Sequence, residues 1–420
     1  MAENNKIRNI AFLSTYPPRE CGLATFTEDL VNEIDKISFI RSSVIAVGHV
    51  EEYVDSRVKY KLSQHNRASY LQTALWVNRN VDLLVIEHEY GIFGGECGEY
   101  ILDLAKELKI PFVVTTHTVL QEPSAKQQAV LQDLGRLSTK VVVMAESSIP
   151  ILAGTYGIET RKIVFIPHGV PNMRMESREK LKSKHGLRNK KVVSSFGLIS
   201  PAKGLEYGIE AVAKAVQDHD DLIYLILGKT HPGVKASMGE NYRHSLIALA
   251  EDLGIQNHVR FIDKYLTKEE VITYLHLSDM YLTPYLSKEQ AVSGTMAYAM
   301  GCGRVIISTP YRYAQEMLGG GRGMLAGFKD SDSMASCIRT VLANPALQKE
   351  MEMKTLAVGR TMTWTKVADR YAELCMHILE DAGIQQHKNL NLHLLPSPTA
   401  AVPIAPSYLR IIKRNELGLV

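Results

Sequence analysis

Short runs of β-branched and other apolar residues recur along the chain, separated by segments in which apolar residues follow a helical spacing. The first half has six such runs: Ile10–Ser14, Ser43–Val47, Leu83–Glu87, Phe112–Thr116, Val141–Met144 and Ile163–Pro167. The second half has five: Val192–Phe196, Leu222–Leu227, Val259–Ile262, Met280–Pro284 and Val305–Ser308. Strands buried on both faces have this composition, and helix-length gaps between them are typical of right-handed βαβ units. The pattern therefore predicts an α/β protein with doubly wound parallel sheets.

The series of predicted strands is interrupted once, by a charged stretch over residues 175–191. A chain of 420 residues exceeds a single hydrophobic core, so we place a domain boundary there. We predict an α/β domain over 1–175 and a second α/β domain over 186–365, with ligands bound where the strand ends face each other. A closing helix over 366–384 follows from its apolar spacing, and the Pro- and Asn-rich segment 385–420 is predicted to be a loosely ordered tail.

Composition and charge exclude several classes of protein. The net charge of +3 is too small to indicate a nucleic-acid partner. The five cysteines are odd in number and scattered, so they indicate neither a zinc site nor a disulfide framework. No apolar run approaches the roughly 18 residues that a membrane-spanning helix needs, and no signal-peptide core precedes the first strand. We expect a cytoplasmic protein, with peripheral attachment to the inner face of the membrane left open.

Two features of the second half predict a site for a phosphate-bearing ligand. Residues 286–309 read as a loop, a helix that opens on Ser293-Gly294-Thr295, and a strand. The first N–H groups of a helix lack partners inside it and its dipole is positive at that end, so a helix start binds anions. Lys203 follows another predicted strand and adds a point charge, although an isolated loop lysine is more often solvated. Together these groups predict a site that neutralises a diphosphate without a metal.

The first half carries a glycine and two histidines at the ends of predicted strands. Gly22 follows the first strand and two prolines, where it would let the backbone turn tightly toward a phosphate or sugar; a plain strand–helix turn is the alternative. His117 ends the run VVTTHT, and His88 with Glu89 ends the run before it. Strand ends of such folds face the ligand, so these groups are candidates for a sugar hydroxyl or a developing charge. A lone histidine is more often structural, and neither spacing indicates a metal.

Taken together, these motifs resemble the retaining glycosyltransferases of family 4 over roughly residues 8 to 380. PPRECG is similar to that family's glycine-rich first loop, with Cys21 where a second glycine is usual. VVTTHT resembles its strand-end histidine motif and IPHGV its interdomain segment. FGLISPAKG is similar to its G-R-x-x-x-x-K-G motif, and MAYAMGCGRVIIST to its E-A-M-A-C-G-x-P-V-I segment. The resemblance implies the GT-B architecture, in which two Rossmann-like domains face each other across a cleft.

The chain also departs from the family pattern in two other respects. The family's arginine beside the diphosphate is Leu198 here, and its pair of glutamates eight residues apart falls on Gln290 and Tyr298. In relatives the first glutamate contacts the donor sugar and the second the ribose. Gln290 and Tyr298 can form hydrogen bonds but bring no charge. Glu289 lies next to Gln290, and a register shift of one residue would put it in the first position.

The resemblance implies a retaining transfer of a hexose from GDP-mannose or a UDP-hexose to a saccharide or glycolipid hydroxyl. It assigns His117 and Lys203 to catalysis, and Gly22, Lys203, Ser293, Gly294 and Thr295 to the donor diphosphate. It also assigns Glu289, Gln290 and Tyr298 to the donor sugar and ribose. We place the nucleobase near Lys264 and Tyr265, directly after a predicted strand, and the acceptor near His88 and Glu89.

Other functions remain compatible with these residues. A second chemistry on the same fold, such as an epimerase or a phosphorylase, is one alternative. A non-catalytic protein that binds a nucleotide-sugar is another, suggested by Leu198, Gln290 and Tyr298. We expect no cofactor, no metal and no nucleic-acid partner, and the oligomeric state is left open.

Overall fold

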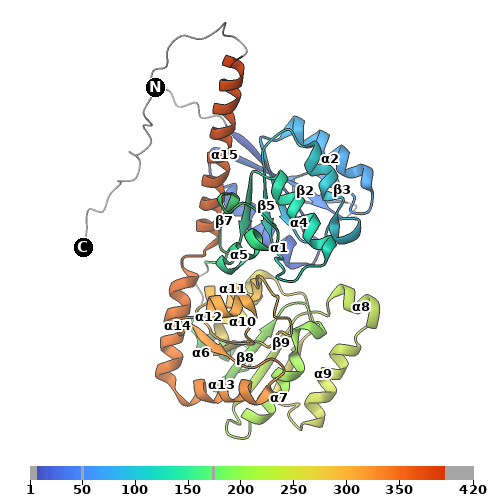
Figure 1. Cartoon of the computed structure of the whole chain (residues 1–420). Helices are drawn as coiled ribbons and strands as arrows, with labels where there is room; N and C mark the ends of the chain where they lie inside the picture. The colour runs from blue at the N-terminus through green and yellow to red at the C-terminus, as the bar shows by residue number, and fades with distance from the viewer. Residues whose placement is uncertain (1–6, 49–51, 173–175, 393–420) are drawn as a thin grey trace, which may run out of the picture. The chain divides into compact units, whose positions relative to one another are not determined.

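The structure is a computed structural model that describes residues 7–48, 52–172 and 176–392. Within these residues it contains two parallel β-sheets, one in each half of the chain, flanked by helices (Figure 1). The chain divides into one compact unit that ends at Leu379, which holds both sheets, and a second unit from Glu380 onward. The predicted bounds of the two α/β domains remain a prediction.

The first sheet has seven strands in the order β3-β2-β1-β4-β5-β6-β7, all parallel. Its strands are β1 (Arg8–Ser14), β2 (Ile40–Val47), β3 (Val58–Leu62), β4 (Leu83–His88), β5 (Phe112–Thr116), β6 (Lys140–Val143) and β7 (Ile163–Phe165). The helices between them are α1 (Gly22–Ile34), α2 (Arg67–Asn80), α3 (Ile101–Glu107), α4 (Ala125–Leu137) and α5 (Ile149–Gly154), with short 3₁₀ turns η1 (Glu96–Gly98), η2 (Glu146–Ser148) and η3 (Thr160–Lys162).

The second sheet has six parallel strands in the order β10-β9-β8-β11-β12-β13. Its strands are β8 (Lys191–Phe196), β9 (Leu222–Leu227), β10 (Val259–Ile262), β11 (Met280–Thr283), β12 (Val305–Ser308) and β13 (Gly323–Leu325). Its helices are α6 (Arg178–Lys184), α7 (Leu205–Ala215), α8 (Pro232–Met238), α9 (Asn241–Asp252), α10 (Lys268–Leu277), α11 (Gly294–Gly301), α12 (Arg312–Leu318), α13 (Ser331–Ala343), α14 (Pro345–Gly359) and α15 (Trp364–Leu392), with the turn η4 (Pro201–Lys203).

Local sequence explains where these elements form. Every residue of β4 and β9 is buried, as expected for central strands covered by helices on both faces. Helix α4 begins at a capping box of Ser124 and Gln127, and α10 at one of Thr267 and Glu270. Each box satisfies N–H groups that the first turn of the helix leaves unpaired.

Two edge strands, β3 and β13, are missing from the sequence prediction. In β3 only every second residue is well covered, and β13 has three residues, so neither forms a continuous apolar run. Helix α15 extends to Leu392, past the end of the predicted closing helix at residue 384. The rest of the predicted tail, 393–420, lies outside the described residues.

The strand order determines where a ligand can bind. In each sheet the order reverses beside a central strand, β1 in the first sheet and β8 in the second. Ligands of doubly wound sheets bind outside the carboxyl ends of the strands at this point. The turns after β1, β4 and β5 and those after β8 and β11 are therefore the places to look for a site.

Candidate functional site

The turn after β8 carries Lys203. Its backbone passes through Gly204, which has a left-handed conformation with φ of 60°. A Cβ atom there would lie 2.3 Å from the carbonyl oxygen of Pro284, so only glycine fits. This close approach brings Lys203 against the residues that follow β11.

Lys203 and the start of α11 meet through a residue that the sequence analysis did not select, Tyr285. The Lys203 ammonium lies 3.9 Å from the centre of the Tyr285 ring, and the Tyr285 hydroxyl lies 2.9 Å from Oγ1 of Thr295. Oγ1 of Thr295 is in turn 3.1 Å from Oγ of Ser293. We call Lys203, Tyr285, Ser293 and Thr295 the α11 cluster. It joins a cation and three hydroxyl groups at the start of one helix.

The charge of Lys203 acts on Tyr285. Burial by itself would raise the pKa of the Tyr285 hydroxyl, but the nearby ammonium and the hydrogen bonds from Thr295 and Ser293 outweigh it and lower the pKa. A strand-end position directly after Pro284 is the sequence signal that could have identified Tyr285.

The first turn of α11 keeps donors available. Ser293 is the N-cap, and its Oγ accepts a hydrogen bond of 3.3 Å from the backbone N–H of Met296. Among the described residues no acceptor is found for the backbone N–H groups of Gly294 and Thr295. These two groups and the helix dipole point the same way, which is the arrangement that binds phosphate.

His168, from the segment IPHGV, packs directly against this helix start. A Cβ atom on Gly294 would lie 2.9 Å from Nε2 of His168, so the glycine makes room for the ring. Nδ1 of His168 donates to the carbonyl oxygen of Gly169 at 2.7 Å, which leaves Nε2 as the acceptor nitrogen. Burial lowers the pKa of His168 to about 4, so the ring is neutral at physiological pH. The motif IPHGV by itself does not predict a role for this histidine.

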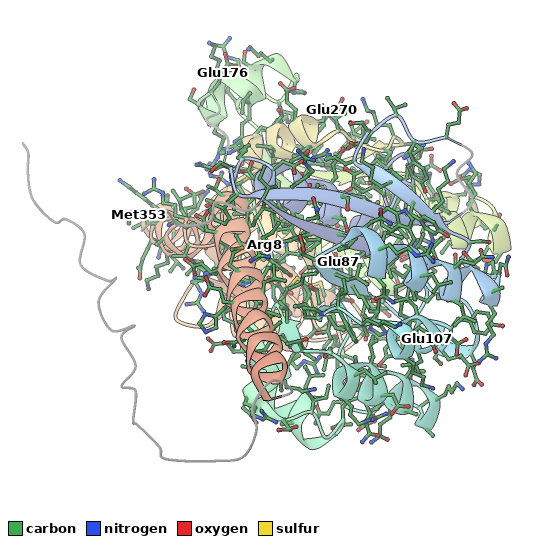
Figure 2. The ribbon with its side chains drawn as sticks, turned by 90° about the horizontal axis from the view of Figure 1, so that it is seen from above. Arg8, Glu87, Glu107, Glu176, Glu270 and Met353 are labelled. Atoms are coloured by element: carbon green, nitrogen blue, oxygen red, sulfur yellow. The ribbon has the colours of Figure 1, made fainter. Side chains whose placement is uncertain are left out.

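In the first sheet, His117 follows β5 and pairs with a buried glutamate. Its Nε2 lies 2.8 Å from Oε2 of Glu87, which is on β4 and fully buried. Glu87 is labelled among the side chains in Figure 2. The edge of Phe26 packs against the His117 ring, with 4.8 Å between ring centres. Sequence reasoning selected His88 and Glu89 but not Glu87. Strand alternation could have found it, because Glu87 is level with Thr115 and so shares a face with His117.

His88 points to the opposite face of β4. Its side chain is fully buried beside the rings of Tyr90 and Phe93, and in the described part of the chain neither ring nitrogen has a hydrogen-bond partner. Burial lowers its pKa to about 3. Glu89 accepts hydrogen bonds from the backbone N–H of Tyr90 at 3.0 Å and from the hydroxyl of Thr118 at 2.5 Å. A role of His88 and Glu89 toward the acceptor stays a prediction.

Gly22 begins α1 without a left-handed backbone, so the turn itself does not require glycine. Nothing lies within 4 Å of the position that a Cβ would take, which leaves open space at this helix start. Cys21 caps the helix: its Sγ accepts from the N–H of Ala24 at 3.4 Å. The turn therefore does not depend on glycine here, and the role of Gly22 toward a diphosphate stays a prediction.

The family's pair of glutamates falls on Gln290 and Tyr298, or on Glu289 in place of Gln290 if the register shifts by one residue. All three side chains form hydrogen bonds with protein atoms. Oε2 of Glu289 accepts from the backbone N–H of Gln121 at 2.8 Å, and Nε2 of Gln290 donates to the carbonyl oxygen of Val292 at 2.7 Å. The hydroxyl of Tyr298 donates to Oδ2 of Asp29 on α1 at 2.6 Å.

Asp29 is itself buried and also contacts the ammonium of Lys268. Burial raises the pKa of Tyr298 above its ordinary value and lowers the pKa of Lys268. Tyr298, Asp29 and Lys268 therefore form a buried contact between α11, α1 and α10. Whether Tyr298 also meets a ribose stays a prediction.

Lys264 and Tyr265, placed near the nucleobase, follow β10. Nζ of Lys264 pairs with Oε1 of Glu270 at 2.5 Å, and the hydroxyl of Tyr265 lies 3.2 Å from Oγ1 of Thr25 on α1. Leu198, at the position of the family's arginine, is half-buried on the turn after β8.

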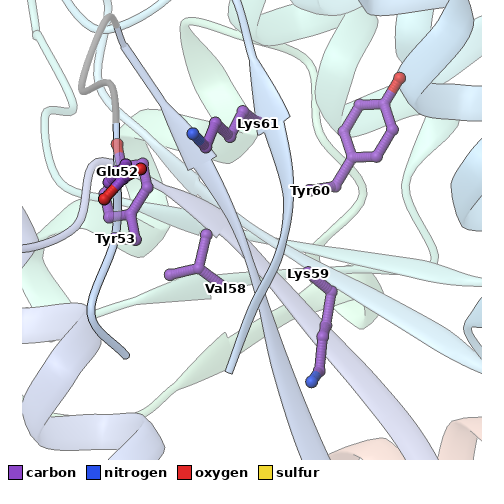
Figure 3. Close-up of a pocket in the computed structure, with 6 residues that line it drawn as sticks. All are labelled: Glu52, Tyr53, Val58, Lys59, Tyr60 and Lys61. Carbon is purple, nitrogen blue, oxygen red and sulfur yellow. The ribbon is translucent and has the colours of Figure 1, made fainter. Parts of the chain in front are cut away.

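A cavity of about 390 Å³ lies at the edge strand β3, away from every predicted site residue (Figure 3). Its walls are Glu52, Tyr53, Val58, Lys59, Tyr60 and Lys61. Within the described residues, no group of three or more His, Cys, Asp or Glu side chains is placed to hold a metal ion. None of the helices in this part of the chain has the length and apolar character needed to cross a bilayer.

Comparison with known proteins identifies the second half of this chain. Residues 177–356, which carry the α11 cluster, match the family model of the glycosyl transferases group 1. The second half of the chain is a group 1 glycosyltransferase domain. The resemblance inferred from its motifs is thereby confirmed. Among curated proteins, this glycosyltransferase is similar to the GDP-mannose-dependent α-(1-6)-phosphatidylinositol monomannoside mannosyltransferase of Mycolicibacterium smegmatis. The two are 22% identical over 348 residues, which cover 79% of this chain and 88% of the relative.

Solved structures of glycosyltransferases share the fold. HepE of Anabaena, in complex with UDP and glucose, matches with a TM-score of 0.71 and 16% identity over 88% of this chain and 100% of that one. Sucrose-phosphate synthase of Thermosynechococcus elongatus matches with a TM-score of 0.74 and 13% identity over 89% of this chain and 100% of that one. The glycosyltransferase therefore has the GT-B architecture, as its sequence predicted.

Proposed function

We propose that this glycosyltransferase moves a hexose from a nucleotide-diphospho-sugar to a hydroxyl of a saccharide or glycoconjugate, with retention and without a metal. The observation that carries the proposal is the α11 cluster. It supplies an ammonium group and three hydroxyls, and beside them lie the backbone N–H groups of Gly294 and Thr295, which have no acceptor among the described residues. Such a set of donors suits a diphosphate leaving group, because it takes up negative charge as that charge develops.

The carboxylates near the strand ends argue against a double displacement. That route needs a free carboxylate beside the anomeric carbon as nucleophile. Here Glu87 is bound to His117, Glu89 to Thr118 and Glu289 to Gln121.

A same-face transfer uses the groups that are available. The acceptor oxygen attacks the anomeric carbon as the bond to the diphosphate breaks, and the departing phosphate oxygen takes the proton of the acceptor hydroxyl. Lys203 and the N–H groups of Gly294 and Thr295 stabilise the leaving phosphate. His117 positions the sugar.

GDP-mannose is the first donor to test, and a UDP-hexose is the second. The curated relative named above is GDP-mannose-dependent, and 88% of its length is covered by the match. At 22% identity, this resemblance supports testing GDP-mannose before a UDP-hexose. It does not single out one acceptor.

The experiment is a donor screen that follows nucleotide release. The purified protein is incubated with GDP-mannose, UDP-glucose and related donors, with and without saccharide acceptors, in EDTA and in Mg²⁺. Acceptor-dependent release that is unaffected by EDTA, with retention seen in the NMR spectrum of the product, is the expected result.

Other outcomes select the alternatives. A new nucleotide-sugar formed without acceptor indicates an epimerase. A sugar phosphate formed from a saccharide and inorganic phosphate indicates a phosphorylase. Binding of donor without turnover indicates a scaffold, which the engaged side chains of Gln290 and Tyr298 would then explain.

A further inference from the structure

Glu87 is a buried carboxylate that follows four apolar residues of β4. Its side chain is fully buried, and its Oε1 has no hydrogen-bond partner within the described residues. Its other oxygen has one partner, Nε2 of His117 at 2.8 Å. Burial of a carboxylate with so few partners is costly, and an unsatisfied buried group of this kind calls for an explanation.

The neighbours of Glu87 do not provide that explanation. Glu89, two residues further on, has both oxygens engaged, with the N–H of Tyr90 and the hydroxyl of Thr118. The nearby hydroxyl of Tyr371 is engaged with Oγ1 of Thr115 at 2.9 Å. Among the described residues, His117 is therefore the partner that accounts for a carboxylate at position 87.

His117 is held at three points. Its backbone N–H donates to the carbonyl oxygen of His88 at 3.0 Å, its ring packs edge-on to Phe26, and its Nε2 faces Glu87. The side chain is still 13% exposed, and among the described residues no hydrogen bond to Nδ1 is found. The ring is thus fixed in orientation and keeps one nitrogen available.

We infer that Glu87 is a positioning residue that fixes the tautomer of His117; this rests on the role proposed for His117 toward the donor sugar. A carboxylate only accepts hydrogen bonds, so the shared proton is on Nε2 and Nδ1 keeps its lone pair. Nδ1 then accepts a hydrogen bond from a sugar hydroxyl. In the other tautomer Nδ1 would carry a proton and could not accept.

The kinetic test is the substitution Glu87→Gln, made in the native protein and in a His117→Ala background. The amide keeps the size of the side chain but can either accept from or donate to Nε2, so it no longer selects a tautomer. We expect kcat/KM to fall roughly tenfold in the native background, the effect of about one hydrogen bond. In the His117→Ala background the same substitution is expected to leave the residual kcat/KM unchanged.

A matched control is Asp82→Asn, which also changes a carboxylate to an amide, at the residue directly before β4. Asp82 accepts a hydrogen bond of 2.7 Å from the backbone N–H of Asn9. We expect Asp82→Asn to leave kcat/KM unchanged. Equal losses from Glu87→Gln in both backgrounds would mean that Glu87 is only structural, and the inference would be wrong.

A second readout does not depend on turnover. In protein labelled with ¹⁵N-histidine, the signal of His117 is the one absent from His117→Ala, and its shifts report which nitrogen carries the proton. We expect protonation at Nε2 in the native protein and a mixture in Glu87→Gln. Protonation at Nδ1 in the native protein overturns the inference. If no donor turns over, the proposed function fails, and the NMR result still decides the role of Glu87.

Discussion

Replacement of Gly294 by alanine separates helix propensity from tertiary packing. Gly294 is the first residue of α11, and alanine is better than glycine within helices by up to about 1 kcal/mol. Rules of local structure therefore predict that Gly294→Ala stabilises the protein. The structure predicts the opposite, because the new Cβ would lie 2.9 Å from Nε2 of His168.

The size of the effect follows from how little His168 can move. Ordinary Cβ contacts lie at 3.4–4 Å, so the ring or the helix must shift by about half an ångström. His168 is 8% exposed, and its ring packs against Phe26 and Trp364, with 5.1 and 5.6 Å between ring centres. Overpacking of this kind costs about 1–3 kcal/mol. Part of the strain moves the start of α11 away from Lys203, so donor binding should weaken as well.

Urea unfolding and donor calorimetry measure the two effects. Gly154→Ala is the matched control, because nothing lies within 4 Å of an added Cβ at that helical position. In a His168→Ala background the clash is absent, so Gly294→Ala should cost much less stability there. The reasoning is refuted if Gly294→Ala is as stable as the native protein and binds donor equally well. An undiminished cost in the His168→Ala background would refute it too.

Three further predictions follow. Lys203→Ala should lower kcat about a hundredfold or more in a steady-state transfer assay, because the leaving phosphate loses its cation; near-native turnover would exclude the proposed diphosphate site. Tyr298→Phe removes a buried hydrogen bond to the charged group of Asp29, so the free energy of unfolding should drop by about 1.5–3 kcal/mol in urea titrations. His88 has a pKa of about 3 when folded, below its ordinary 6.5, mainly through burial. The unfolded chain therefore binds its proton first, and stability is lost as pH falls from about 6.5 toward 3. His88→Leu should lose less stability than the native protein between pH 7 and pH 5, and an equal loss would contradict this account.

The strands of both sheets were predictable because burial on two faces leaves a local signature. The first four residues of β4 and the whole of β9 are apolar, and every residue of both strands is buried. The edge strand β3 has no such signature, since only alternate residues are covered. Pairing with β2 decides that this segment is a strand, and pairing is a property of the folded sheet.

The candidate site was predictable where chemistry and position coincide in one short segment. A helix that opens on Ser293-Gly294-Thr295 offers unpaired N–H groups wherever it lies, so these residues could be selected from sequence as candidates for an anion site, and that role stays a prediction. His168 could not, because its role depends on a contact with Gly294 that only folding creates. The strand-end position of Tyr285 was a signal in the sequence, but its contact with Lys203 comes only from folding.

The sequence by itself determined the two parallel sheets and the family resemblance, and it selected the candidate segments for a phosphate, because each depends on residues close together in the chain. Tertiary structure alone decided the partners of the polar side chains. Tyr298 contacts Asp29, which is 269 residues away along the chain. His117 pairs with Glu87 and not with His88 or Glu89, the two residues that follow Glu87. The alternation of a strand tells which face a side chain takes, but the partner on that face depends on strand order and on the packing of distant helices.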